Sequence, residues 1–89
     1  MADADYYYNR GGDLHDQGKL KEAIAEYRES IRLKPDAADA DAHFNLGNAL
    51  KAQGKLEEAI AEFRKARDNA QHGTEFALLI ERALADTDS

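Results

Sequence analysis

The chain has 89 residues, a length that allows one domain. It has no cysteine, which excludes disulfide bonds and thiolate chemistry, and its net charge of −6 argues against a nucleic-acid partner, because phosphate binding needs a basic surface. The sequence shows neither a secretory signal nor an apolar run of membrane-spanning length, so we expect a cytoplasmic protein that does not contact a membrane.

The spacing of apolar residues in the first half of the chain predicts two helices. The first covers residues 4–16, with Asp3 and Asp5 at its start and with Tyr7, Gly11 and Leu14 on its inner face. Gly18 suits the left-handed turn that ends a helix. The second helix covers residues 20–33, and Pro35 stops it. Its inner residues are Leu20, Ala23, Ile24, Tyr27 and Ile31.

The second half predicts three more helices. The third covers residues 40–53 and ends at Gly54, and the fourth covers residues 56–69. The third has His43, Leu46, Gly47 and Leu50 on its inner face, and the fourth has Leu56, Ala59, Ile60, Phe63 and Ala66. After a break at residues 71–73, a last amphipathic helix covers residues 75–85, and we expect residues 86–89 to fray. Its inner residues are Phe76, Ile80, Ala83 and Leu84.

One stretch of the chain occurs twice. Residues 53–64 repeat residues 17–28 at an offset of 36 residues, and only two of the twelve positions differ. Lys21 corresponds to Glu57, and Tyr27 corresponds to Phe63. A match at a fixed offset indicates a repeat architecture, in which each helical unit buries its apolar face by stacking on a neighbour.

These residues resemble the tetratricopeptide repeat family, in which each repeat is a pair of antiparallel helices. The second repeat carries His43, Leu46, Gly47, Leu50, Ala59 and Phe63 at the motif positions. The first repeat carries Tyr7, Arg10, Gly11, Leu14, Ala23, Tyr27 and Pro35. The match covers residues 4–73. It departs from the family pattern at His43, which replaces an aromatic residue, at Arg10, which replaces leucine, and in having no proline after the fourth helix.

The resemblance implies an all-α, right-handed α-solenoid of five helices that serves as a non-enzymatic protein–protein interaction module. It divides the chain into a repeat at about residues 4–37, a repeat at about residues 40–73 and a capping helix at about residues 74–86. The repeat is two residues longer than the family period of about 34. We expect these extra residues, within 37–41, to lengthen the loop or the third helix.

No set of residues predicts catalysis or a cofactor. His15, His43 and His72 lie 28 and 29 residues apart, without the close pairs that a zinc site needs. The aspartates of residues 36–41 lack the glycine and glutamate of a calcium loop, and helix capping explains them. We therefore expect no enzymatic activity, no metal and no cofactor.

In the resembling family, the first helix of each repeat lines a concave groove. The candidate peptide-binding residues on this face are Tyr8, Asn9, Phe44, Asn45, Asn48 and Lys51. An aromatic ring beside an amide suits an extended peptide, because the ring contacts a side chain and the amide pairs with the backbone. The alternative is that the asparagines are generic family sequence facing water. The acidic balance either serves solubility or favours a neutral or basic protein partner.

Self-association is the rival hypothesis for the function. Stacks of this kind usually need three or more repeats for stability, and this chain has two. Leu78 and Leu79 lie beside the stripe of Phe76, Ile80 and Leu84 and widen it beyond what one neighbouring helix covers. A widened apolar face predicts a weak homodimer that forms through the last helix.

Overall fold

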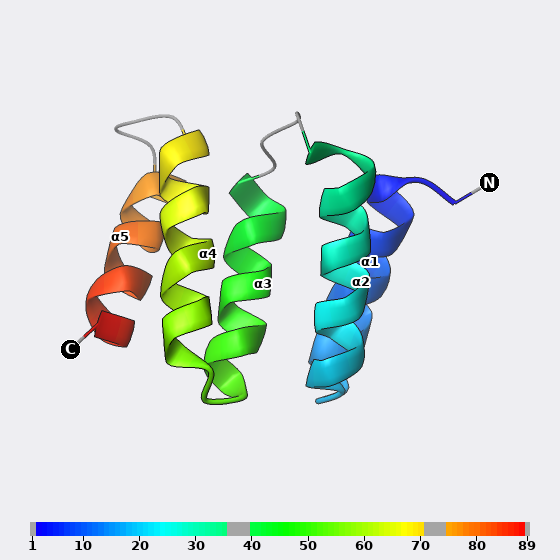
Figure 1. The fold of residues 1–89 in the computed structure, drawn as a ribbon, viewed down its shortest axis with the longest axis horizontal. Helices are drawn as coiled ribbons and strands as arrows, with labels where there is room; N and C mark the ends of the chain where they lie inside the picture. The colour runs from blue at the N-terminus through cyan, green and yellow to red at the C-terminus, as the bar shows by residue number, and fades with distance from the viewer. Residues whose placement is uncertain (1, 36–39, 71–74, 89) are drawn as a thin grey trace.

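The computed structural model describes residues 2–35, 40–70 and 75–88 and has five helices (Figure 1). These are α1 (Ala4–Asp16), α2 (Leu20–Leu33), α3 (Ala40–Ala52), α4 (Leu56–Asn69) and α5 (Glu75–Asp88). The described residues contain no strand, so the predicted all-α helical-repeat solenoid is confirmed.

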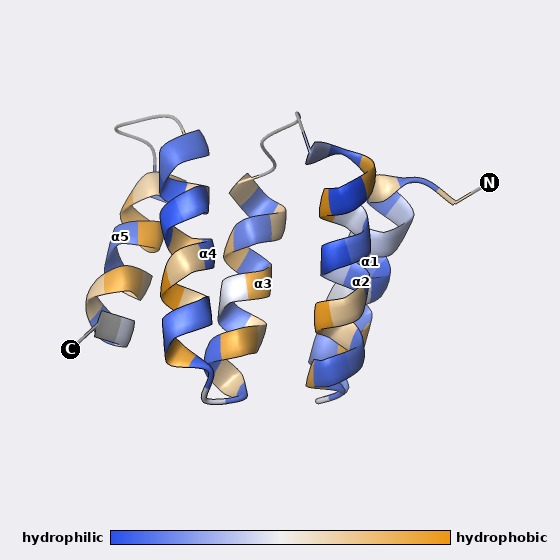
Figure 2. Cartoon of the chain, viewed as in Figure 1, coloured by the Kyte–Doolittle hydropathy of each residue, from blue (hydrophilic) through white to orange (hydrophobic). Residues whose placement is uncertain are grey.

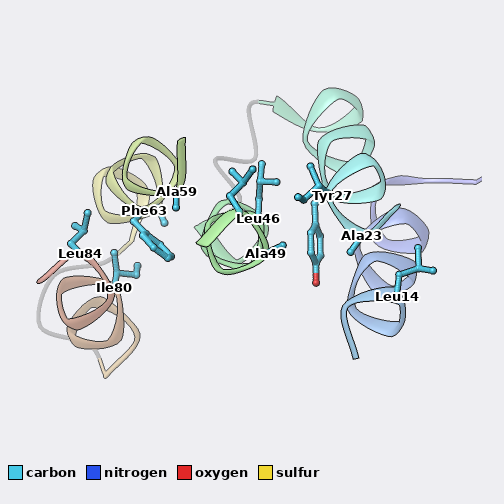
Figure 3. Packing of buried hydrophobic residues seen from close by; sticks show 12 residues of the cluster. Leu14, Ala23, Tyr27, Leu46, Ala49, Ala59, Phe63, Ile80 and Leu84 are labelled. Carbon is cyan, nitrogen blue, oxygen red and sulfur yellow. The ribbon is translucent and has the colours of Figure 1, made fainter. Parts of the chain in front are cut away.

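Each helix packs against the next one along the chain, and α1 also contacts α3. The helices stand side by side in Figure 1, and polar and apolar residues alternate along each of them in Figure 2. In the view of Figure 3, α2 and α4 lie on one side of the stack, α1 and α5 lie on the opposite side, and α3 lies between. The amphipathic faces therefore meet inside one continuous stack.

The same turn joins the two helices of each repeat. Gly18 and Gly54 have φ values of 78° and 83°, in the left-handed region that glycine adopts without strain. The Lys19 backbone N–H donates to the Leu14 carbonyl at 2.9 Å, and the Lys55 N–H donates to the Leu50 carbonyl at the same distance. The predicted turns at both glycines are confirmed.

The start of α1 is held by two side chains. Asp3 accepts a hydrogen bond from the Tyr6 backbone N–H at 3.0 Å, as its predicted capping role requires. The buried Ser30 hydroxyl on α2 donates to the Ala4 carbonyl at 2.8 Å. This second bond joins the first turn of α1 to the end of α2.

The core draws residues from all five helices (Figure 3). Its largest fully buried side chains are Tyr27, Phe63, Leu50 and Ile80. Two glycines admit the two large rings. A Cβ atom built on Gly11 would lie 2.6 Å from the Tyr27 ring, and one on Gly47 would lie 2.7 Å from the Phe63 ring. Both glycines therefore mark close contacts between the helices of a repeat, as predicted.

Three predicted details are wrong. Leu56 was expected inside but is 46% exposed, because it is the first residue of α4 and has no preceding helical turn beside it. Helix α5 continues through Asp88, where a frayed tail was expected, because Thr87 is buried and donates to the Ala83 carbonyl at 2.7 Å. Helix α3 ends at Ala52, one residue early. Residues 37–39 of the insertion predicted within 37–41, and the break predicted at residues 71–73, lie outside the described residues.

Candidate functional site

The six candidate residues divide between α1 and α3. Tyr8 and Asn9 lie on α1, and the other four lie on α3. Asn9 is exposed, and the remaining five are half-buried. We call the surface formed by Tyr8, Asn9, Phe44, Asn45, Asn48 and Lys51 the asparagine surface.

Two of these residues meet across the boundary between the repeats. The Asn45 side-chain Nδ2 donates to the Tyr8 hydroxyl at 2.7 Å, although the residues are 37 positions apart in the chain. Asn9, Asn48 and Lys51 have no side-chain hydrogen bond within the described residues. The structure therefore brings Tyr8 and Asn45 together and leaves the other polar candidates on the surface without a fixed side-chain partner in the described part of the chain.

The two candidate aromatic rings also pack inward. The Tyr8 ring centroid lies 6.0 Å from that of Tyr27, and the Phe44 centroid lies 5.7 Å from that of Phe63. Phe44 also makes an edge contact with Phe76 of α5, with 5.4 Å between the centroids. Much of each ring is therefore used to join helices, and only the remaining part is available to a ligand.

Burial keeps Tyr27 neutral. Burial, together with the nearby Tyr8 and Asp16, raises the pKa of Tyr27 to about 12. The hydroxyl of Tyr27 therefore stays protonated over the physiological pH range and provides no nucleophile or base.

A hollow lies between α2 and α4, over α3. It has a volume of about 400 Å³ and was not predicted from the sequence. Its lining residues are Arg28, Ile31, His43, Leu46, Leu50, Glu58, Ala61, Glu62 and Lys65. We call it the α2–α4 groove. Its lining combines apolar side chains with charged ones, and the polar pair of His43 and Glu62 is largely buried.

Ion pairs within the α2–α4 groove neutralise most of its charge. His43 Nδ1 lies 3.0 Å from one oxygen of Glu62, and the Lys65 ammonium donates to the other at 3.2 Å. Burial alone would raise the pKa of Glu62, but the hydrogen bonds to His43 and Lys65 outweigh it and lower that pKa. Arg28 faces Glu58 across the groove at 3.8 Å, with both side chains exposed. The lining therefore has no dominant charge that would select an ionic ligand.

Family models match most of this architecture. One described as TPR repeat matches residues 13–54, and one described as tetratricopeptide repeat matches residues 40–71. Together they cover α2, α3 and α4 and the close contact between Gly47 and the Phe63 ring in repeat two. The chain belongs to the tetratricopeptide repeat family. A comparison with curated proteins gave no match.

Membership in this family makes the chain a protein–protein interaction module, and TPR proteins are typically non-catalytic scaffolds. Within the described residues of this TPR chain, no three histidine, aspartate or glutamate side chains come together in a way that would hold a metal ion. None of the helices searched has both the length and the apolar character needed to cross a membrane. His15 lies half-buried on α1, and His72 falls outside the described residues.

Proposed function

We propose that this TPR module binds an extended peptide segment of a protein partner on the asparagine surface. The observation that carries the proposal is the hydrogen bond from Asn45 to Tyr8 at 2.7 Å. It supports a binding role because it holds an amide group in a fixed orientation on a surface shared by α1 and α3.

The chemistry of the amide explains why a fixed Asn45 suits a peptide. A carboxamide has two N–H donors and one acceptor oxygen. Because one N–H of Asn45 bonds to Tyr8, the second N–H and the oxygen remain for a ligand. An extended peptide backbone offers the complementary carbonyl and N–H groups. An amide that is already oriented loses less side-chain entropy when it binds.

The residues around Asn45 extend the same chemistry. Asn48 lies one turn further along α3, and Lys51 lies a further turn on, so their side chains are neighbours on the helix surface. Asn9 occupies the place in α1 that Asn45 occupies in α3, at the 36-residue offset. Polar contacts to a peptide backbone carry little sequence information, so we expect a loose sequence preference.

The partner should be neutral or basic, because the chain carries a net charge of −6. Two repeats provide a short surface, and much of the Tyr8 and Phe44 rings is already packed against other helices. We therefore expect weak affinity, on the order of 10 μM to 1 mM, which corresponds to about −4 to −7 kcal/mol.

The test is an NMR titration of the chain with a library of neutral, basic and acidic peptides. We expect the Asn45 and Asn48 signals to move with neutral and basic peptides. The Asn45→Ala variant should weaken binding and keep its helical content, because the half-buried side chain is not part of the hydrophobic core. Asn69→Ala is the matched control, since Asn69 is an exposed asparagine whose side chain, within the described residues, bonds to the Lys65 carbonyl of its own helix.

Tyr8→Phe gives a finer test, because it keeps the ring and removes the hydroxyl that orients Asn45. It should weaken binding by less than Asn45→Ala does. The proposal is wrong if the signals that move belong to Arg28, Glu58 and Lys65, on the rim of the α2–α4 groove, while Asn45 does not respond. It is also wrong if Asn45→Ala and Asn69→Ala bind equally well.

A further inference from the structure

An exposed stripe runs along α5. Glu75, Leu78, Leu79 and Arg82 follow the spacing i, i+3, i+4 and i+7, which puts them on one face of the helix. Leu78 is 62% exposed and Leu79 is 50% exposed, although both are large apolar side chains. We call these four residues the α5 stripe. The buried side of the same helix carries Ile80 and Leu84.

The side of α5 that carries Glu81 does not suit a further helix of the same repeat type. The inner residues of α5 follow those of α3 at an offset of 34 residues: Phe76, Ile80, Ala83 and Leu84 correspond to Ala42, Leu46, Ala49 and Leu50. At this offset, Glu81 takes the place of Gly47. A Cβ atom at Gly47 would already lie 2.7 Å from the Phe63 ring, so a glutamate there prevents the same close packing.

The α5 stripe is complementary to itself. We propose that a second copy of this chain covers it, with the two α5 helices antiparallel about a two-fold axis. In the register that puts Leu78 opposite the partner's Leu79, Glu75 stands opposite the partner's Arg82, because each lies three residues further from the centre. The pair then has four leucines at its centre and an ion pair at each end.

The charges fix the orientation of the pair. Glu75 and Arg82 have no ion-pair partner within the described residues. They are seven residues apart on their own helix, about 10 Å along its axis, which is too far for an ion pair. A parallel arrangement would place Glu75 opposite the partner's Glu75, and only the antiparallel one brings opposite charges together. On its own helix, Arg82 also has Asp86 four residues on. One helix face per copy is a small interface, so the dimer is weak and depends on concentration.

The first test is analytical ultracentrifugation of the full chain from about 10 μM to about 1 mM. The average mass should rise from 9.9 kDa towards twice that value. Leu78→Glu should remain monomeric throughout. Arg64→Glu is the charge-matched control for the Arg82→Glu variant below, since Arg64 is exposed on α4, and it should associate as the unmodified chain does. Circular dichroism checks that each variant keeps its helices.

The second test addresses the register. Arg82→Glu and Glu75→Arg each place like charges opposite one another and should weaken association about tenfold. The double variant E75R/R82E restores opposite charges in the antiparallel register and should regain the association of the unmodified chain.

Several results would overturn the proposal. The proposal is wrong if the chain is monomeric at about 1 mM, if Leu78→Glu associates as the unmodified chain does, or if the double variant associates no better than the single variants. Loss of association in Asn45→Ala but not in Leu78→Glu would move the contact to the asparagine surface. This proposal does not depend on peptide binding, which the titration with Asn45→Ala measures separately.

Discussion

A methyl group added at Gly47 tests how closely the two helices of a repeat pack. The Cβ atom of Gly47→Ala would lie 2.7, 2.8 and 3.1 Å from three carbons of the Phe63 ring. The ring is 0% exposed, and the Phe44 ring packs beside it at 5.7 Å, so it has little room to move away.

Two opposing effects set the size of the change. Replacing glycine by alanine in a helix stabilises it by about 1 kcal/mol. Overpacking a well-filled core costs about 1–3 kcal/mol. The clash is with a buried ring rather than the flexible end of a side chain, so we expect the cost to exceed the gain. Gly47→Ala should lower the free energy of unfolding by about 1 kcal/mol, and Gly47→Leu should lower it by about 1–3 kcal/mol.

Gly12 is the matched control in the same protein. A Cβ atom there would lie 3.8 Å from the Tyr27 hydroxyl, which is an ordinary contact. Gly12→Ala should therefore keep the helix-propensity gain of about 1 kcal/mol. In a thermal melt followed by circular dichroism, each kcal/mol corresponds to about 4–8 °C in a domain of this size. The two alanine variants should thus shift the melting temperature in opposite directions.

Gly47 is not at a close contact if Gly47→Ala raises the melting temperature as much as Gly12→Ala does. A double-mutant cycle then locates the contact. In the Phe63→Leu background the ring is gone, so Gly47→Ala should cost less, with an interaction energy of about 0.5–3 kcal/mol. Additive effects in this cycle would show that Gly47 and Phe63 do not constrain each other.

Three further predictions concern hydrogen-bonding and titrating groups. Tyr27 has a pKa of about 12 in the fold, whereas in the unfolded chain it ionises near pH 10. The free energy of unfolding should therefore fall by up to about 2.7 kcal/mol between these two pH values. Tyr27→Phe should remove this fall in urea melts. The pKa of Glu62 is lowered in the fold, so its ionised carboxylate stabilises the fold at pH values above the ordinary glutamate pKa, and this stabilisation is lost as the pH falls below that value. Glu62→Gln should therefore reduce the loss of unfolding free energy between about pH 5 and pH 3. Ser30→Ala removes the buried bond to the Ala4 carbonyl and should cost about 1 kcal/mol, with faster amide exchange in the first turn of α1.

The fold could be predicted from the sequence because its determinants are local and occur twice. The left-handed turns at Gly18 and Gly54 and the helical spacing between them lie within single repeats. The close contacts at Gly11 and Gly47 follow from small residues on inner helix faces, and both are observed. Such features need no knowledge of how distant helices are oriented.

The details of the surfaces depend on that orientation and could not be predicted. The contact between His43 and Glu62 joins residues 19 positions apart, and the α2–α4 groove needs three helices at defined angles. The sequence identified Tyr8 and Asn45 separately as surface candidates, but not the hydrogen bond that joins them. The only sequence signal for the groove was His43 itself, a polar residue at a position where the family has an aromatic one.

Arg10 and Leu46 occupy the same position in the two repeats but have different neighbours. Leu46 is buried on α3, which packs against α2 on one side and α4 on the other. Arg10 occupies the corresponding place on α1, where its side chain is 53% exposed and lies 3.5 Å from Glu26. Glu26 corresponds to Glu62, which instead pairs with His43 and Lys65. The same position therefore holds leucine where a helix covers it and an ion pair where water does, because an unpaired charge is costly only when it is buried. The place of a repeat in the stack thus determines which side chains its motif positions tolerate.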